Sequence, residues 1–288
     1  GFIPSAARKD QDMRRFLFVG CGNMGGAIAS AAMRAIPDAR ITVVDPSPER
    51  AKALLPASMA VEMHPDFAKL GEARFDLSIL CVKPQQFAEL SPLAISVIRS
   101  GAIASIMAGV TLDALAARLG SERIARTMPN LPALVGQAMT VGVAADGLTQ
   151  ADRRMVATLF EAVGQFRWLS DESLVDAATA VAGSGPGYIF AFAQYMMEAA
   201  MASGMDAALA DLLVRQTFRG AAELMHADPR TAEELKKAVT SKAGTTEAGL
   251  AVFEAEGALP ELCLKAVAAA AQRARELSRT ATPESPRQ

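Results

Sequence analysis

Three glycines, Gly20, Gly22 and Gly25, form the pattern Gly-x-Gly-x-x-Gly directly after the apolar residues 16–19. Where a strand turns into a helix, the first glycine permits the tight turn, the second lets the backbone approach a pyrophosphate, and the third allows close packing. Free N–H groups at the start of the helix attract the phosphates. The pattern predicts a dinucleotide-binding turn, because the unit that follows also fits it. The alternative is a glycine-rich turn that binds no ligand.

Asp45 stands 20 residues beyond the third glycine, at the end of a predicted strand over residues 41–44. An acidic residue at this spacing commonly binds the adenosine ribose hydroxyls, and its charge repels a 2′-phosphate, which favours NAD. Ser47 and Arg50 follow closely, and either could instead hold the 2′-phosphate of NADP. Alternatively, Asp45 caps the turn made by the prolines around it. The pattern predicts ribose contact and leaves the choice between NAD and NADP open.

Lys83 is a second candidate, because it follows the apolar strand pattern of residues 76–82. Pro84 prevents that strand from continuing, and the loop after a parallel strand borders the ligand crevice of an α/β sheet. Lys83 is therefore predicted to lie near the phosphates or the nicotinamide of a bound dinucleotide. The alternative is a solvated surface lysine.

The composition argues against several classes of protein. A net charge of −2 is not that of a nucleic-acid-binding surface, and no apolar run reaches the roughly 18 residues of a membrane span. The three cysteines, Cys21, Cys81 and Cys263, lie far apart and lack the spacing of metal ligands. A reduced, cytoplasmic protein without a metal is the simplest interpretation.

Predicted strands and helices alternate as far as about residue 170, and beyond it only helical patterns remain. Such alternation indicates an α/β fold with a doubly wound sheet. We therefore expect a Rossmann-type domain over residues 13–171 and an all-helical domain over residues 172–279. Residues 1–12 are interpreted as a tail or a remnant of expression, and residues 280–288 as a disordered tail.

Proline and capping patterns give three local predictions. Residues 86–98 have the pattern of one helix, and residues 112–119 that of a short helix capped by Thr111. Pro129 and Pro132 predict an extended, rigid path between two strands.

The predicted helix over residues 186–203 is apolar on nearly all sides. Such a helix is buried on most sides, and a helical domain of this size can hardly surround it alone. We expect a second subunit to cover it. The alternative is a central helix of a monomeric bundle.

Small and hydroxyl residues crowd residues 240–246, ahead of a predicted helix. The free N–H groups of a helix start bind a carboxylate well. The segment predicts a pocket for a substrate anion, whereas the alternative is that Thr245 or Thr246 caps the helix.

Four motifs follow one another along the chain: VKPQ at residues 82–85, SIMAGV at 105–110, RTMPNLPALVG at 126–136 and GSGP at 183–186. Together with the glycine turn, their order and spacing resemble the pyrroline-5-carboxylate reductase family over nearly all of residues 13–277. The resemblance implies a Rossmann domain, a helical dimerisation domain, a homodimer or a ring of dimers, and NADP or NAD as cofactor. It also implies reduction of Δ1-pyrroline-5-carboxylate to L-proline, the final step of proline biosynthesis.

The resemblance further implies which residues form the site. Substrate contacts would come from Ser241, Gly244, Thr245 and Thr246, with the Thr246 hydroxyl facing the ring nitrogen as the catalytic group. Asp45 joins the cofactor contacts on its spacing alone. The implied cofactor contacts lie in the glycine turn or where predicted strands end: Val19, Gly20, Cys21, Gly22, Asn23, Met24, Ser47, Cys81, Val82, Lys83, Pro84, Ile106, Met107 and Ala108.

Two residues depart from the family's substrate loop, which usually reads Thr-Ser-Pro-Gly-Gly-Thr-Thr. Lys242 replaces the proline and Ala243 replaces the first glycine. Ala243 requires either a backbone without positive φ or the acceptance of strain, and Lys242 adds a charge. Either change could alter carboxylate affinity or the order of the loop.

Other functions fit part of the sequence. Another imine reductase or a 3-hydroxyacid dehydrogenase would share the glycine turn, but the dehydrogenase normally needs a lysine on a long helix, and residues 186–203 contain none. A non-catalytic NAD(P)H sensor would need the cofactor turn but not the small-residue segments at residues 183–187 and 240–246. Cofactor binding without turnover would favour the sensor.

Overall fold

The computed structural model describes residues 14–36 and 38–280. Within them, contacts define two compact units: residues 14–183 together with 270–280, and residues 184–269. The predicted tails lie outside the described residues, except that Thr280 is the last residue of helix α13 (Ala258–Thr280).

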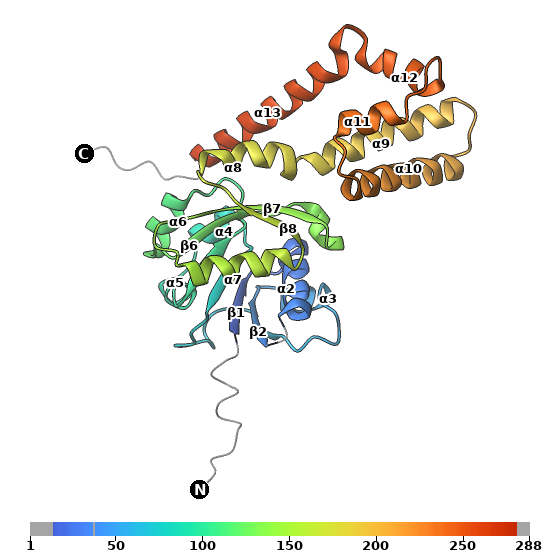
Figure 1. The fold of residues 1–288 in the computed structure, drawn as a ribbon. Coiled ribbons are helices and arrows are strands. Elements are labelled where there is room, and N and C mark those ends of the chain that lie inside the picture. The colour runs from blue at the N-terminus through green and yellow to red at the C-terminus, as the bar shows by residue number, and fades with distance from the viewer. Residues whose placement is uncertain (1–13, 37, 281–288) are drawn as a thin grey trace. The chain divides into compact units, whose positions relative to one another are not determined.

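The first unit is built on one eight-stranded sheet in the order β3-β2-β1-β4-β5-β6-β7-β8. Figure 1 shows this sheet with β1, β2, β6, β7 and β8 labelled. Neighbouring strands are parallel except for β6 and β7, which are antiparallel. The chain winds outward from β1 in both directions, which confirms the predicted doubly wound α/β sheet. The strands are β1 (Arg14–Val19), β2 (Ala39–Val44), β3 (Glu62–His64), β4 (Leu77–Leu80), β5 (Ala102–Ser105), β6 (Ile124–Met128), β7 (Ala138–Ala144) and β8 (Gly164–Trp168).

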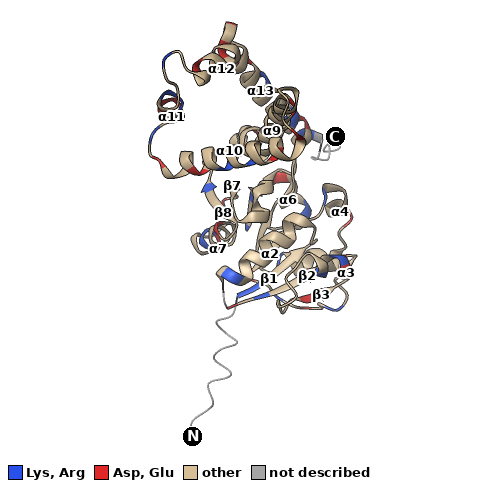
Figure 2. Cartoon of the chain, turned by 90° about the vertical axis from the view of Figure 1, so that its right-hand side faces the viewer, with Lys and Arg blue, Asp and Glu red and all other residues tan. Residues whose placement is uncertain are grey.

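Helices cover both faces of this sheet, so its strands are apolar on both sides. Phe16 and Phe18 of β1 point to one face, and Leu17 and Val19 point to the other. Figure 2 shows helix α2 in tan along most of its length, since Arg34 is its one charged residue. The first face packs against α2 (Asn23–Ala35), α3 (Pro48–Ala53) and α7 (Gln150–Glu161), and the second against α4 (Pro84–Ala88), α5 (Pro92–Ile98) and α6 (Leu112–Leu119).

The single helix predicted over residues 86–98 is wrong, because the structure divides it into α4 and α5. Pro92 lacks the N–H needed to continue a helix but fits the first turn of a new one. The Ser91 hydroxyl accepts a hydrogen bond from the Ala94 N–H at 3.2 Å and caps α5. The predicted cap at Thr111 is confirmed, since its hydroxyl accepts from the Ala114 N–H at the start of α6.

The extended path predicted around Pro129 and Pro132 is wrong in its second half. Residues Leu131–Val135 form a 3₁₀ helix, η1, with Pro132 in its first turn. Proline at this position needs no N–H acceptor, and its fixed φ suits a helical turn. Gly136 ends η1 with a φ of 72°, a left-handed conformation that glycine adopts readily.

The second unit is helical. Its elements are α9 (Gly185–Ala202), α10 (Ala207–Ala227), α11 (Ala232–Ala238), α12 (Thr245–Glu254), η3 (Ala255–Gly257) and the first part of α13. No helix of the described chain is long and apolar enough to cross a membrane.

The compact units divide after Gly183, whereas the sequence placed the domain boundary where strands cease, after residue 171. Helix α8 (Ser173–Ala178), the π-helical turn η2 (Thr179–Gly183) and the end of α13 all belong to the sheet unit. The Arg126 side chain on β6 explains this grouping, because it bonds to groups on α13 and in the segment at α8.

Candidate active site

The glycine turn joins β1 to α2 and has a different geometry at each glycine. Gly20 has a φ of 86°, which side chains rarely permit. A Cβ at Gly25 would lie 2.9 Å from the Gly20 carbonyl oxygen, so the helix meets the strand too closely for any side chain. A Cβ at Gly22 would meet no atom within 4 Å. The turn therefore packs closely against the sheet at Gly20 and Gly25, whereas the space beside Gly22 is unoccupied by the described residues.

Helix α2 begins with backbone donors that the rest of the described chain leaves free. It starts at Asn23, and Gly22 caps it without a side-chain hydrogen bond. The first intrahelical turn bond runs from the Gly26 N–H to the Gly22 carbonyl at 2.8 Å. The N–H groups of Asn23, Met24 and Gly25 have no acceptor among the described residues. This is the arrangement that binds phosphate groups.

Asp45 is buried, with 5% of its surface exposed, and both of its carboxylate oxygens accept backbone hydrogen bonds. One accepts from the Cys21 N–H at 2.8 Å, and the other from the Ser47 N–H at 2.8 Å. The second bond is the turn cap that the sequence left as an alternative. The first ties the glycine turn to the loop after β2, so Asp45 holds two parts of the predicted cofactor site together. Its contact with ribose stays a prediction.

The two cysteines of this region are protonated thiols. Burial and, to a smaller extent, the charge of Asp45 raise the pKa of Cys21 to about 11, and the Arg50 charge opposes this rise. Burial, with the nearby Cys21, also raises the pKa of Cys81. A neutral thiol is a poor nucleophile, so these residues line the predicted site without reacting in it.

The remaining predicted cofactor residues follow the carboxyl ends of β4 and β5, beside the glycine turn. The Cys81 N–H donates to the Val19 carbonyl at 2.8 Å, and the Ile106 N–H donates to the Leu80 carbonyl at 3.1 Å. Lys83 is exposed at the start of α4. Ligands of open α/β sheets bind at this edge. The structure thus brings together the predicted cofactor residues: Val19, Gly20, Cys21, Gly22, Asn23, Met24, Asp45, Ser47, Cys81, Val82, Lys83, Pro84, Ile106, Met107 and Ala108.

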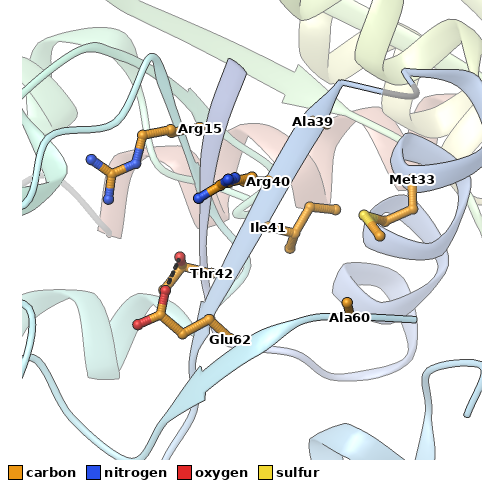
Figure 3. A pocket seen from close by; sticks show the side chains of 8 residues that line it. All are labelled: Arg15, Met33, Ala39, Arg40, Ile41, Thr42, Ala60 and Glu62. Carbon is orange, nitrogen blue, oxygen red and sulfur yellow. Dashed lines mark hydrogen bonds between the residues drawn. The ribbon is translucent and has the colours of Figure 1, made fainter. Parts of the chain in front are cut away.

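A hollow of about 640 Å³ lies elsewhere on the same sheet (Figure 3). Arg15, Ala39 and Arg40 border it, and they stand where β1 and β2 begin. The Thr42 hydroxyl donates to Glu62 across it at 3.3 Å. This is the edge opposite the carboxyl ends of the strands, so the hollow is not the predicted cofactor site.

The predicted substrate residues lie in the helical unit, at the start of α12. Gly244 is the N-cap residue and makes no side-chain cap, so the alternative in which Thr245 or Thr246 caps the helix is wrong. Neither hydroxyl bonds to another described residue. The N–H groups of Thr245, Thr246 and Glu247 likewise find no acceptor in the described chain. Backbone donors and hydroxyls are therefore available together for an anion.

Aromatic packing positions α12 within its unit. The Phe253 ring of α12 lies 5.7 Å from the Phe192 ring of α9, which lies 6.0 Å from the Phe218 ring of α10. Lys236 of α11 adds an ion pair with Glu254 at 2.6 Å. These contacts fix the helix whose first turn carries the predicted substrate residues.

Ala243 could have avoided a positive φ or accepted backbone strain, and in the structure it is strained. Its φ is 56°, in the left-handed region. Its N–H donates to a carboxylate oxygen of Glu247 at 2.6 Å.

Glu247 was not among the predicted site residues, and Arg126 was predicted only as the first residue of the motif at residues 126–136. A glutamate three residues after an N-cap was the available signal for Glu247, because this position often folds back to the preceding backbone. Arg126 had no local signal, since its partner Ser278 is 152 residues away in the chain.

Two family models match the chain. The model described as "Pyrroline-5-carboxylate reductase dimerisation" matches residues 172–277, and that described as "NADP oxidoreductase coenzyme F420-dependent" matches residues 15–109. The pyrroline-5-carboxylate reductase of Pseudomonas aeruginosa is 36% identical over 267 residues, which are 92% of this chain and 97% of that protein. The chain belongs to the pyrroline-5-carboxylate reductase family.

Other members of the pyrroline-5-carboxylate reductase family match over similar lengths. The enzyme of Pisum sativum is 34% identical over 267 residues, covering 91% of this chain and 95% of that protein. The solved structure of a pyrroline-5-carboxylate reductase from Coxiella burnetii is 30% identical and has a TM-score of 0.84 over 93% of this chain and 99% of its own. The dimerisation model also spans the whole of α12, so the predicted substrate residues fall inside a matched region.

Proposed function

We propose that this protein reduces Δ1-pyrroline-5-carboxylate to L-proline with NADPH or NADH. The observation that carries the proposal is the match to reductases of that name over nine-tenths of the chain. In this proposal, residues 13–171 bind the dinucleotide, and residues 172–279 form the dimerisation and substrate domain. The free helix-start donors at α2 and α12 support it, since one set suits phosphates and the other suits a carboxylate.

We propose that the protein prefers NADPH to NADH, because the side chains in the loop after β2 favour binding of the 2′-phosphate that only NADPH carries. Each oxygen of Asp45 already accepts a backbone N–H, so less of its hydrogen-bonding capacity is left for a ribose hydroxyl. Ser47 and Arg50 are exposed, and Arg50 has no partner among the described residues. The Arg50 charge is also close enough to the glycine turn to oppose the rise in the Cys21 pKa that burial causes.

The first test follows nicotinamide absorbance with Δ1-pyrroline-5-carboxylate and either NADPH or NADH. We expect turnover with both and a kcat/KM about tenfold higher with NADPH, since a charge-assisted hydrogen bond contributes about 1.5–3 kcal/mol. Arg50→Gln is expected to remove most of this difference and to leave the NADH value unchanged. Lys52→Gln, on the same helix, is the matched control. Tight cofactor binding without turnover on any cyclic imine would reject the proposal in favour of a sensor.

The chain's own contribution to the reaction is to position the substrate. Bound NAD(P)H supplies a hydride for the imine carbon. The N–H groups around Gly244–Thr246 hold the substrate carboxylate, and the Thr246 hydroxyl orients the ring nitrogen, which binds protonated or gains its proton from water. A hydroxyl is too weak an acid to drive protonation by itself. Catalysis therefore rests on proximity and orientation, which supply about 7–11 kcal/mol in favourable cases.

Thr246→Ala is expected to lower kcat about 10- to 100-fold and to leave the NADPH dissociation constant unchanged. The loss equals one hydrogen bond to a charged group, about 1.5–3 kcal/mol. Stopped-flow turnover and cofactor fluorescence titration measure the two quantities. Thr246→Ser keeps the hydroxyl and should retain most of kcat. Unchanged turnover in the alanine variant would remove Thr246 from the mechanism.

We further propose that the helical unit forms a homodimer, alone or within a ring of dimers, in the cytoplasm. None of the residues of α9 is buried in the chain, which does not fit a central helix of a monomeric bundle. Its exposed side chains include Ile189, Phe190 and Tyr195, at 54%, 58% and 62%. Exposed apolar surface of this size supports contact with a second copy. The unpaired cysteines support a reducing compartment.

A further inference from the structure

The segment before α12 is a tight turn whose own sequence does not favour it. The Gly244 N–H donates to the Ser241 carbonyl at 3.0 Å, which closes a four-residue turn. Its third residue, Ala243, has a φ of 56°, whereas Lys242 is not among the residues with positive φ. This is the type II pattern, which prefers proline at the second position and glycine at the third. Lysine and alanine stand there instead, so the turn needs support from outside itself.

Glu247 provides a bond that reaches back to this turn. Its carboxylate oxygen accepts the Ala243 N–H at 2.6 Å. A bond to an ionised acceptor is about twice as strong as a neutral one, and the positive end of the α12 dipole stabilises a carboxylate in the first helical turn. Glu247 therefore binds the one residue of the turn whose conformation is strained.

The turn in its present shape arranges the predicted substrate groups. A Cβ on Gly244 would overlap the Ser241 hydroxyl oxygen, so that hydroxyl lies directly over the N-cap residue. The free N–H groups of Thr245 and Thr246 follow immediately. If Ala243 relaxed toward negative φ, the Ser241–Gly244 hydrogen bond would break and the hydroxyl would leave the helix start.

We propose that Glu247 is a positioning residue for the substrate carboxylate. Its bond to the Ala243 N–H holds the left-handed turn that aligns Ser241 with the start of α12. This inference rests on the proposed function of residues 241–246 and goes beyond it, because Glu247 acts through the backbone and touches neither substrate nor cofactor.

Four variants test the role: Glu247→Ala, Glu247→Gln, Ala243→Gly and the double variant Ala243→Gly/Glu247→Ala. Glu247→Ala is expected to raise the KM for Δ1-pyrroline-5-carboxylate about tenfold, the effect of one charge-assisted bond, with the KM for NADPH unchanged. Glu247→Gln keeps an acceptor and should show a smaller rise. Ala243→Gly relieves the strain, so the double variant should recover most of the lost affinity.

Hydrogen exchange of the peptide that contains residues 241–247 provides a readout independent of activity. Exchange should quicken in Glu247→Ala and slow again in the double variant. Glu261→Ala, which removes an exposed glutamate paired with Lys265 in the same unit, should leave both exchange and KM unaltered.

Two results would overturn the role of Glu247. If Glu247→Ala changes neither KM nor exchange, the bond does not hold the turn. If the double variant loses as much affinity as Glu247→Ala, Glu247 acts on the substrate directly and not through Ala243. Absence of turnover in the unaltered protein would reject the proposed function instead, and the exchange measurement would still decide whether Glu247 holds the turn.

Discussion

Gly22→Ala is expected to weaken NADPH binding about 100-fold while leaving the folded state as stable as before. An added Cβ meets no atom within 4 Å, and the φ of −78° at Gly22 suits any residue. The same Cβ would stand over the start of α2, where the backbone must approach the pyrophosphate. Loss of one or two charge-assisted bonds, at about 1.5–3 kcal/mol each, gives the expected factor. Fluorescence titration with NADPH and thermal melting measure affinity and stability on the same sample.

Gly25→Ala is the matched comparison, because it should lose stability as well as affinity. Its Cβ would lie 2.9 Å from the Gly20 carbonyl oxygen and 3.2 Å from the Cys81 Cβ, so backbone must move. The two variants are therefore expected to differ: Gly22→Ala should lose only NADPH affinity, and Gly25→Ala should lose both affinity and stability. Normal NADPH affinity in Gly22→Ala would show that the phosphates do not bind at this helix start.

Arg126→Met is expected to lower the free energy of unfolding by about 3–5 kcal/mol, the usual cost of removing one partner of a buried ion pair. Arg126 is 2% exposed. Its guanidinium lies 2.7 Å from a Glu172 oxygen and 3.5 Å from an Asp176 oxygen, and it donates to the Ser278 hydroxyl at 3.4 Å. The methionine would leave these carboxylates facing an apolar side chain. Urea titration followed by the fluorescence of Trp168, the single tryptophan, reports on the sheet unit.

The carboxylates that pair with Arg126 are partly exposed to solvent. The Glu172 side chain is 29% exposed, so water can solvate it once Arg126 is replaced. The loss in the free energy of unfolding should therefore lie near the lower end of the expected range. Adding Asp176→Asn to Arg126→Met should recover stability, because one unpaired charge disappears. Arg215→Met removes an exposed pair with Asp211 and should cost under about 1 kcal/mol. A similarly small loss for Arg126→Met would contradict the buried-pair interpretation.

Local sequence was sufficient where a feature depends on neighbouring residues. The glycine turn, the apolar strands and the Thr111 cap each involve residues a few positions apart, and the structure has all of them. The prediction failed at residues 86–98 for a local reason as well, because the helical pattern was given more weight than Pro92. The helical spacing of apolar residues can continue across a proline, although the backbone hydrogen bonds of the helix cannot.

The sequence by itself determined the fold class, the family and the groups that could bind phosphate and carboxylate, because these follow from residue types and short spacings. Only the tertiary structure decided how those groups are held. Asp45 bonds to Cys21 from 24 residues away, and Arg126 reaches Ser278 across 152 residues. Such contacts depend on which strands become neighbours in the sheet, and no local pattern encodes that choice. The left-handed conformation of Ala243 is likewise seen only in the structure, where its N–H donates to a carboxylate oxygen of Glu247.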